Sequence, residues 1–230
     1  MKYNKKIEFA KFVERPNRFN ALVKLNNEII TVHVPNTGRC KELLVEGATV
    51  ILRKEDNETR KTKYDLVSVY KNGKLINIDS QIPNKVVYEA LQNGKIEKLK
   101  EYKNIAKEKT FGKSRFDFKL INDLGETYYL EVKGVTLEEE GFCKFPDAPT
   151  ERGSKHLLEL IDVKKEGMGA GVLFLLQMDG MKEFSPNEER DEKFSKCLRE
   201  AYKNGVDIFV YECKVFEDGI EIDKEVKLVL

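Results

Sequence analysis

Long hydrophobic runs and a secretion signal are both missing from this sequence of 230 residues, and each absence excludes a class of protein. The most apolar stretch, residues 171–176, is far shorter than the roughly 20 residues that span a bilayer, so we expect no membrane partner. The first six residues include three lysines and are not followed by the apolar core of a secretion signal. We therefore expect a cytoplasmic protein.

Cysteine and histidine are too scarce and too scattered for a zinc site or a disulfide scaffold. The four cysteines include no Cys-x-x-Cys pair, and the chain has only two histidines. Structural zinc sites usually take their ligands from closely spaced pairs, and disulfide-dense folds are typical of small secreted domains. We interpret all four cysteines as reduced thiols.

The charges that are present are unevenly distributed along the chain. Residues 1–120 hold 26 Lys and Arg against 15 Asp and Glu, whereas residues 121–230 hold 15 against 25. A basic half beside an acidic half suits a polyanionic partner bound by the first half. The alternative is that Lys is simply the commonest surface residue here, and composition alone slightly favours that alternative.

Residues 1–80 have the pattern of a small β-rich domain. Turn sequences, among them Asn26-Asn27 and Asn72-Gly73, separate short apolar segments at residues 21–25, 29–34, 48–52, 64–70 and 75–78. Such turns are typical of hairpins, and five or so strands in 80 residues predict an OB-like β-barrel. The pattern changes near Pro83. We therefore expect an OB-like nucleic-acid-binding domain over residues 1–80 and a second domain over residues 81–230.

Residues 81–230 alternate between helical and strand-like patterns. The predicted helices cover residues 84–91, 151–166 and 188–204, and a glycine follows each within three residues. The predicted strands cover residues 114–121, 127–137, 170–178, 207–215 and 221–229. Asn84 is the expected N-cap of the first helix, and Asp147, Thr150 and Ser154 are alternative caps of the second. This alternation predicts an α/β domain in which helices flank a mixed sheet, α+β overall with the barrel included.

The segments at residues 114–121 and 127–137 carry the residues most suited to chemistry. Apolar and charged residues alternate in both, so each strand has one core face and one charged face. Asp117 and Glu131 fall on the charged face, where they would supply hard oxygen ligands to Mg²⁺ or Mn²⁺. Lys133 would orient or activate an attacking water and neutralise charge on a phosphate. The alternative, a solvated strand face held by salt bridges, fits the pattern about equally well.

The loop between these two segments predicts their register. Residues 122–126 have the sequence of a three-residue hairpin loop with Gly125 in the left-handed conformation. Symmetric pairing about Leu124 places Asp117 opposite Glu131, with Cβ atoms about 4.5–5.5 Å apart. A slip of one residue would turn charged side chains into the core, so the pairing is strongly specified.

Two groups of polar residues are candidate phosphate contacts. In the first domain, residues 33–39 form a polar turn, and Arg15 and Arg18 flank another turn; Arg side chains and turn amides both bind anions. Alternatively, residues 36–38 merely cap a helix that begins near Arg39. In the second domain, basic residues sit at the positive end of a helix dipole, which favours an anionic partner; we expect His156 there to pack at the surface. The candidate DNA-binding residues are Arg15, Arg18, His33, Asn36, Arg39, Lys41, Arg115, Arg152 and Lys155.

Asp117 followed by Glu131-Val132-Lys133, on adjacent predicted strands with a helix before and after, resembles the core of PD-(D/E)xK nucleases. More specifically, the sequence resembles the sugar fermentation stimulation protein A family over almost its whole length. Five blocks in the same order carry this resemblance: residues 12–19, 33–44, 114–118, 131–133 and 145–157.

The resemblance implies an OB-like domain followed by a nuclease-like domain, DNA binding, and an association with sugar catabolism. The family's Asp, Glu and Lys fall on Asp117, Glu131 and Lys133. Nucleases of this core often place a further Glu on the preceding helix, which makes Glu89 a candidate metal ligand, although an ordinary surface Glu is the more frequent role. Gln177, at the end of a predicted strand, either faces the site or is a satisfied core amide.

Together, these observations favour a DNA-binding protein without sequence preference that carries a phosphodiester-cleaving site dependent on Mg²⁺ or Mn²⁺. Two alternatives stay open. One is a non-catalytic DNA-binding transcriptional regulator on a nuclease-like fold; the other is an RNA-processing nuclease, because an OB-like barrel accepts either nucleic acid. No helix-turn-helix or zinc finger is evident, so base-specific readout is not supported. The sequence does not decide between single- and double-stranded DNA, and it is compatible with a homodimer.

Overall fold

The computed structural model describes all 230 residues, which cluster into two compact units. The first unit comprises residues 1–82 together with two short returns of the chain, residues 177–179 and 213–221. The second comprises residues 83–176, 180–212 and 222–230. None of the helices has the length and hydropathy that crossing a bilayer requires.

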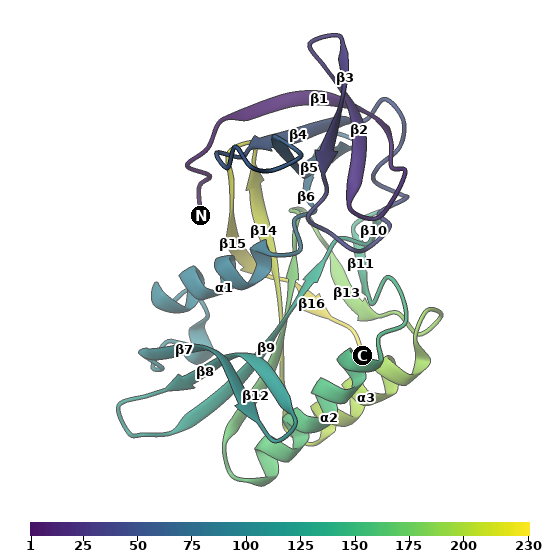
Figure 1. Cartoon of the computed structure of the whole chain (residues 1–230). Helices are drawn as coiled ribbons and strands as arrows, with labels where there is room; N and C mark the ends of the chain where they lie inside the picture. Colours follow the sequence, from purple (N-terminus) through teal and green to yellow (C-terminus); the bar gives the residue numbers. More distant parts are fainter. The chain divides into compact units, whose positions relative to one another are not determined.

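The first unit is built on a barrel that closes through a parallel bridge between His33 and Asp65 (Figure 1). Its strands have the order β3-β2-β1-β4-β5-β6. Strand β1, which comes first in the sequence, is not among the predicted strands. The strands are β1 (Ile7–Glu14), β2 (Asn20–Leu25), β3 (Glu28–His33), β4 (Thr49–Lys54), β5 (Tyr64–Lys71) and β6 (Lys74–Asn77).

Two predicted hairpin turns are confirmed. Asn26 and Asn27 have φ of +50° and +70°, and Asn72 and Gly73 have φ of +51° and +79°. Positive φ at both central residues is the mark of the type I′ turn, whose twist matches that of the flanking strands. Asparagine tolerates this left-handed conformation better than most residues do, which explains its use at three of the four positions.

The second unit centres on a six-stranded mixed sheet of order β15-β14-β12-β9-β8-β7. Strands β7, β8 and β9 pair antiparallel, whereas β9, β12 and β14 pair parallel. Parts of β14 and β15, within residues 213–221, belong to the first unit. The six are β7 (Asn104–Phe111), β8 (Ser114–Ile121), β9 (Thr127–Val135), β12 (Gly169–Leu176), β14 (Asp207–Phe216) and β15 (Gly219–Glu225).

A smaller sheet and four helical segments complete the chain. The smaller sheet has the order β10-β11-β13-β16; its strands are β10 (Glu138–Glu139), β11 (Phe142–Phe145), β13 (Glu183–Pro186) and β16 (Lys227–Leu228). The helices are α1 (Ile82–Gln92), α2 (Glu151–Lys165), α3 (Glu192–Lys203) and the short 3-10 helix η1 (Glu97–Leu99). An OB-like barrel followed by a mixed sheet with helices is the architecture that the sequence predicts.

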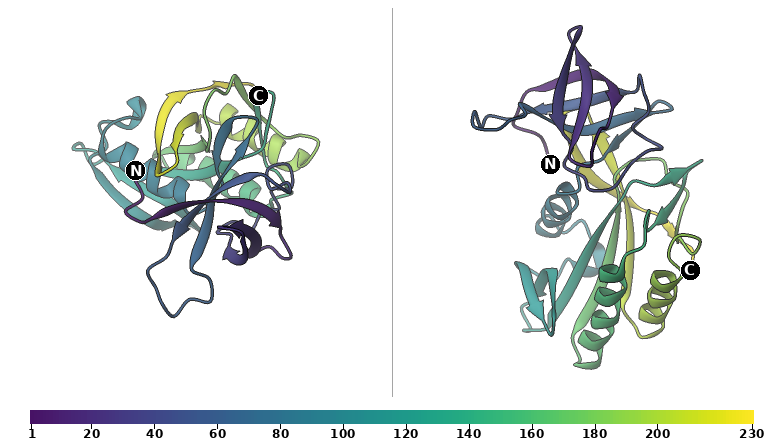
Figure 2. Two further views of the ribbon diagram at one scale, coloured as in Figure 1. Left: turned by 90° about the horizontal axis from the view of Figure 1, so that it is seen from above. Right: turned by 45° about the vertical axis from the view of Figure 1, so that its right-hand side comes forward.

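Helices α2 and α3 pack side by side along the sheet (Figure 2), and the N-cap of α3 also contacts the N-cap of α2. Thr150 is the N-cap of α2, accepting a hydrogen bond from Gly153 N at 3.0 Å. Asp191 caps α3 through Phe194 N at 2.9 Å, and its second oxygen accepts from Thr150 N at 2.7 Å. Each cap contributes about 1 kcal/mol to stability, and the shared aspartate fixes where α2 begins.

Candidate metal and nucleic-acid site

The loop between β8 and β9 has the predicted geometry. Gly125 adopts φ of +80°, and Asn122 N donates to Glu126 O at 3.2 Å. The Asn122 side chain reinforces the loop, since its Oδ1 accepts from Glu126 N at 2.9 Å. Ile121 consequently lies opposite Thr127, which confirms the predicted register.

This register brings Asp117 and Glu131 together at the point where the two strands part. Backbone pairing between β8 and β9 ends at Phe118 and Leu130, and Asp117 and Glu131 are the next residues. Beyond that point, Asp117 Oδ2 accepts a hydrogen bond from Val132 N at 2.7 Å. The Asp117 carboxylate therefore takes the place of a strand partner and lies beside Glu131.

Glu131 is only 4% exposed, and both hydrogen bonds of its side chain involve one oxygen. Lys133 Nζ donates to Glu131 Oε1 at 2.5 Å, and His156 Nδ1 lies 2.6 Å from the same atom. The other oxygen, Oε2, is buried and has no hydrogen-bond partner. Buried carboxylate oxygens are normally paired because desolvation of an unpaired one is costly. A cation is the ligand whose charge suits this atom.

The surroundings move the pKa values of the two carboxyl groups in opposite directions. Burial raises the pKa of Asp117, and the charge of Glu131 raises it further, against hydrogen bonds from Val132 and Asn84. Burial also opposes ionisation of Glu131, but the hydrogen bond from His156 and the charge of Lys133 outweigh it and lower the pKa. Glu131 thus keeps its negative charge, and a cation near both groups would relieve their repulsion.

Asn84, which the sequence pattern did not connect with the site, contacts Asp117 from α1. The helix begins at Ile82, so Asn84 is not its N-cap as predicted; it lies in the first turn and donates Nδ2 to Asp117 Oδ1 at 2.7 Å. Glu89, the predicted further metal ligand, is exposed five residues later on this helix. Successive helical residues are about 100° apart, so Glu89 points roughly 140° away from Asn84. The role of Glu89 as a metal ligand stays a prediction.

His156 is buried, with 4% of its surface exposed, so the expectation that it packs at the surface is wrong. Its ring lies between Glu131 and Arg152, and Arg152 Nε donates to His156 Nε2 at 3.4 Å. Because Nε2 accepts a hydrogen bond, Nδ1 carries the ring proton and donates to Glu131. Sequence reasoning missed this contact, which links an exposed arginine to a buried carboxylate.

The donor set of the pair fits a hard divalent cation that keeps part of its water shell. No group of three or more His, Cys, Asp and Glu side chains in the structure is placed to hold a metal ion. Mg²⁺, however, is commonly bound through only one or two carboxylates while several waters remain. Asp117 and Glu131 supply that number, and the unpartnered Glu131 Oε2 is the free donor atom.

Arg15, a predicted phosphate contact, holds two loops of the first unit together. Its Nη atoms donate to the backbone oxygens of Arg18, Asn36, Gly38 and Arg39 at 2.6–2.8 Å. The remaining donor, Nε, is buried without a partner. Since the guanidinium has five N–H donors, these bonds leave little of Arg15 to present to a phosphate. Its role in the structure is to shape the loops.

His33 and Asn36 also have their side chains occupied within the first unit. His33 Nδ1 lies 2.9 Å from Asp65 Oδ1. Asn36 Nδ2 donates to Ile78 O at 2.7 Å, and its Oδ1 accepts from Gly38 N at 2.7 Å. Residues 34–48 contain no helix, so the alternative prediction that this turn caps one is wrong.

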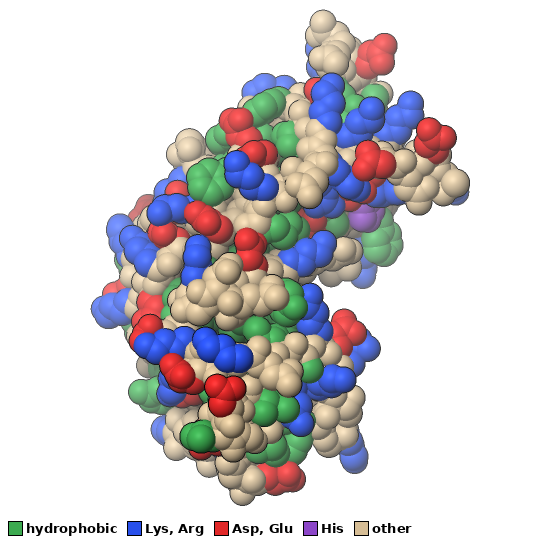
Figure 3. All heavy atoms as spheres, turned by 90° about the vertical axis from the view of Figure 1, so that its left-hand side faces the viewer, with side chains coloured by type: hydrophobic (Ala, Val, Ile, Leu, Met, Phe, Trp, Pro, Cys, Tyr) green, Lys and Arg blue, Asp and Glu red, His purple; other side chains and the backbone are tan.

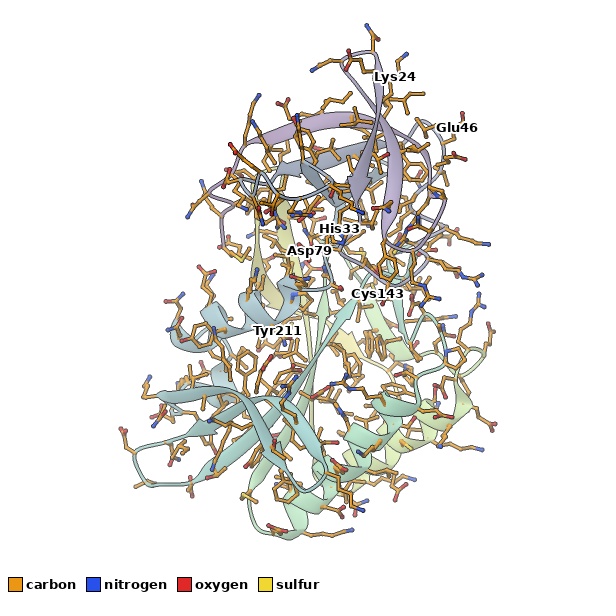
Figure 4. The ribbon with its side chains drawn as sticks, in the orientation of Figure 1. Lys24, His33, Glu46, Asp79, Cys143 and Tyr211 are labelled. Carbon is orange, nitrogen blue, oxygen red and sulfur yellow. The ribbon has the colours of Figure 1, made fainter.

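The His33–Asp65 contact belongs to a buried charge cluster. Arg53 donates to Asp65 at 3.0 Å and to Asp79 at 3.2 Å, and Arg60 donates to Asp65 at 2.5 Å. Burial opposes ionisation of Asp65, but the hydrogen bonds from Arg60 and His33 outweigh it, so the pKa of Asp65 is lowered. Figure 4 labels His33 and Asp79, two members of this cluster. The charged groups of the cluster pair with one another, so we assign the cluster a structural role.

The other predicted DNA contacts are exposed. Arg18, Arg39 and Lys41 lie on the first unit and form no ion pair, whereas Arg115, Arg152 and Lys155 lie on the second. Figure 3 shows one face of the molecule, on which basic and acidic side chains are interspersed. Any phosphate contacts on that face would therefore be made by individual Lys or Arg side chains, because the face has no continuous patch of positive charge.

Gln177 is a satisfied core amide, which is one of the two alternatives the sequence left open. Its Nε2 donates to the backbone oxygens of Asn77 and Asp79 and to Asn77 Oδ1, at 2.8–3.2 Å. All three residues belong to the first compact unit. Gln177 therefore does not contribute to the carboxylate pair.

Two family models match the chain in consecutive stretches. Residues 13–78 match the SfsA N-terminal OB domain. Residues 81–219 match the sugar fermentation stimulation protein RE domain. The first match covers the barrel strands from the end of β1 onward, and the second covers α1 and all the residues of the carboxylate pair.

Similar proteins span the whole chain. A sugar fermentation stimulation protein homolog of Clostridium tetani (strain Massachusetts / E88) is 68% identical over 226 residues, covering 98% of each chain. A homolog of Clostridium botulinum (strain Loch Maree / Type A3) is 64% identical over 228 residues, covering 99% of each. The solved structure of Pyrococcus furiosus SfsA in complex with Ca²⁺ superposes with a TM-score of 0.89, at 26% identity and 100% coverage of both chains.

Proposed function

The chain belongs to the sugar fermentation stimulation protein family, and on that premise we propose that it binds DNA and hydrolyses phosphodiester bonds at the Asp117–Glu131 pair with a divalent cation. The observation that carries this proposal is the buried, unpartnered Glu131 Oε2 beside a second carboxylate. A nuclease core of the PD-(D/E)xK type is part of the proposal, since Lys133 follows Glu131 at the spacing of that motif.

Asp117 and Glu131 would hold the cation, for which Mg²⁺ and Mn²⁺ are our candidates. When bound, the cation supplies Lewis-acid chemistry to a phosphoryl oxygen. The related Pyrococcus furiosus structure is a complex with Ca²⁺, another cation that prefers oxygen ligands. Asn84 and the Val132 amide orient the Asp117 carboxylate, while His156 and Lys133 fix Glu131 Oε1 and leave Oε2 for the cation.

Lys133 has the position and charge to assist the reaction. Its ammonium group lies at the carboxylate pair and is largely but not fully buried, with 17% of the side chain exposed. In hydrolysis a water oxygen bonds to phosphorus and gives up a proton, the bond from phosphorus to one ester oxygen breaks, and the departing oxygen takes up a proton. Negative charge grows on the phosphate as this happens, and a fixed cation such as Lys133 stabilises it.

Exposed basic residues near the pair would bind the DNA backbone. Arg115 lies two residues before Asp117 on β8, and Arg152 contacts His156 from the start of α2. Lys155 lies on the same helix and is also exposed. Contacts of this kind recognise phosphate without reading bases, so we expect binding without sequence preference. A link to sugar catabolism, which the names of the relatives suggest, is also part of this proposal.

Incubation of the protein with single- and double-stranded DNA and RNA, in Mg²⁺, Mn²⁺ or EDTA, tests the proposal. We expect DNA cleavage that requires the metal and is lost in Asp117→Asn and Glu131→Gln. Asp123→Asn is the matched control, because it removes an exposed carboxylate from the same hairpin and should leave cleavage unchanged. DNA binding without cleavage would indicate a non-catalytic DNA-binding regulator, and cleavage of RNA alone would indicate an RNA-processing nuclease.

A further inference from the structure

Two loops of the first unit are joined into one fixed surface, which we call the Arg15 platform: residues 15–19, between β1 and β2, and residues 34–41, after β3. The Arg15 guanidinium donates to backbone oxygens in both loops, at Arg18 and at Asn36, Gly38 and Arg39. A backbone hydrogen bond from Val34 N to Phe19 O at 2.7 Å ties the loops together at their base. These bonds hold the platform in one conformation.

The side chain of Phe19 stands on this platform, exposed and without a partner. Its exposed fraction is 56%, and its ring forms no aromatic pair and no cation–π contact in the structure. The Asn17 side chain fixes its backbone, since Asn17 Oδ1 accepts from Phe19 N at 2.9 Å. A large apolar ring held out into solvent by a rigid loop is available to a ligand.

Free positive charge accompanies the ring. Arg18, Arg39 and Lys41 are exposed on the two loops and form no ion pair. Residues 15–19 contain no Asp or Glu, and residues 34–41 contain none either; the first carboxylate after the second loop is Glu42. The platform therefore offers one flat apolar surface together with cations that no carboxylate neutralises.

We propose that the Arg15 platform binds an unpaired nucleotide of single-stranded DNA, with the base stacked on Phe19 and the flanking phosphates on Arg18, Arg39 and Lys41. An exposed aromatic ring among basic residues is the combination by which proteins bind single strands, because every base has a face that stacks. In a duplex these faces are covered by neighbouring base pairs, and only the phosphates remain available. This inference rests on the proposed function in one respect, namely that DNA is the partner.

Arg15 has a positioning role in this site. Its guanidinium acts within the platform, and its planar, five-donor group is what allows it to bridge four carbonyl oxygens. Lysine keeps the charge but has three donors on one nitrogen. We therefore expect Arg15→Lys to weaken single-strand binding although net charge is conserved, and Arg15 would act through the loops it holds.

Tryptophan fluorescence gives a direct test, since the chain contains no tryptophan. In Phe19→Trp the new indole is the only one, and stacking of an oligo(dT) base on it should quench its emission. Phe9→Trp is the matched control: Phe9 is exposed to a similar extent, 49%, on the same unit. It borders a hollow in which one lysine, Lys74, is outnumbered by three carboxylates, Asp179, Glu217 and Asp218, so the hollow disfavours phosphate. Its emission should not respond to the oligonucleotide.

Binding affinities complete the test. Phe19→Ala should raise the Kd for oligo(dT) about tenfold, which is ~1.4 kcal/mol and within the range for one stacked base, while the Kd for duplex DNA changes little. Phe9→Ala should change neither value. An unaltered Kd for oligo(dT) in Phe19→Ala, or equal losses on single strand and duplex, would overturn the inference. If the wild type binds duplex but no single strand, the inference fails and the proposed function stands; if it binds neither, both fail.

Discussion

His156 Nδ1 lies 2.6 Å from Glu131 Oε1, and each of these residues is only 4% exposed. The contact joins helix α2 to strand β9, so the helix that carries the exposed Arg152 also fixes one oxygen of the central carboxylate. Lys133 donates to the same oxygen. Glu131 therefore has one oxygen bound to protein and the other left without a partner.

This arrangement predicts that His156 sets the affinity of the site for metal. His156→Leu removes the donor, whereas His156→Asn keeps an N–H group of similar reach. Hydrogen-bond partners of metal ligands typically contribute 10–100-fold to affinity, so the Leu variant should need at least about tenfold more Mn²⁺ to give the same rise in melting temperature. The Asn variant should lie closer to the wild type. A purely structural role would lower the melting temperature in both variants without shifting the Mn²⁺ dependence.

Metal binding itself should stabilise the folded chain. A ligand at 100 times its Kd adds about 2.7 kcal/mol of stability, which raises the melting temperature of a chain of this size by several degrees. Millimolar Mn²⁺ or Mg²⁺ should produce this rise in the wild type, and Asp117→Ala should abolish it. Asp123→Ala, which alters the same hairpin at an exposed position, should retain it. A wild type that melts at the same temperature with metal and with EDTA would contradict the site.

The parts of the fold that sequence predicts well are those fixed by neighbouring residues. The hairpin loop around Gly125 requires a left-handed residue, and the alternating pattern on both sides makes any other register costly. These two local facts were sufficient to place Asp117 beside Glu131. The turns at Asn26-Asn27 and Asn72-Gly73 follow from the same turn chemistry.

The parts that sequence reasoning missed depend on contacts between distant residues. Arg15 has the sequence context of a phosphate contact, and only the approach of residues 36–39 shows that its donors are occupied. Strand β7 (Asn104–Phe111) lies at the sheet edge, is largely exposed, and so lacks an apolar face that would mark it as a strand. The burial of His156 was accessible in principle, because Leu157 and Leu160 lie on the same side of the helix.

Salt dependence should distinguish phosphate contacts from the platform residues that only shape the loops. Each phosphate neutralised adds about 0.7 to the slope of log K against log salt for single strands, and about 0.9 for duplex. The double variant Arg18→Ala, Arg39→Ala should therefore lower the oligo(dT) slope by about 1.4. Arg15→Lys should weaken binding and leave the slope nearly unchanged. Fluorescence anisotropy of labelled oligo(dT), at about 50 to 300 mM KCl, measures the affinity and its salt slope. Equal slopes in the wild type, the double variant and Arg15→Lys would contradict the assignment of Arg18 and Arg39 as phosphate contacts.

The charge cluster of the first unit predicts how stability depends on pH. Arg60 and His33 lower the pKa of Asp65, which is only 5% exposed. A carboxyl group whose pKa is lower in the folded state contributes stability above its unfolded pKa of about 3.9, and that stability is lost as pH falls through the lowered value. Asp65→Asn also removes one charged partner of Arg53 and of Arg60, which costs about 2 kcal/mol, although Arg53 keeps Asp79 and Arg60 keeps Glu55.

We therefore expect Asp65→Asn to melt well below the wild type at pH 7. The difference should narrow as pH falls below about 4, because the unfolded wild type then takes up a proton at Asp65 that the folded state binds only at lower pH. Asp56→Asn is the control, because the Asp56 side chain is 80% exposed and its ion pair with Lys5 is long, at 3.9 Å. That variant should match the wild type within about 0.5 kcal/mol at every pH. The melting temperatures of the wild type and both variants are compared by circular dichroism at about pH 3.5, 5 and 7, of which the lowest lies below the usual carboxyl pKa. A gap between Asp65→Asn and the wild type that is equally wide at all three values would show that packing, and not the charge of Asp65, stabilises this end of the barrel.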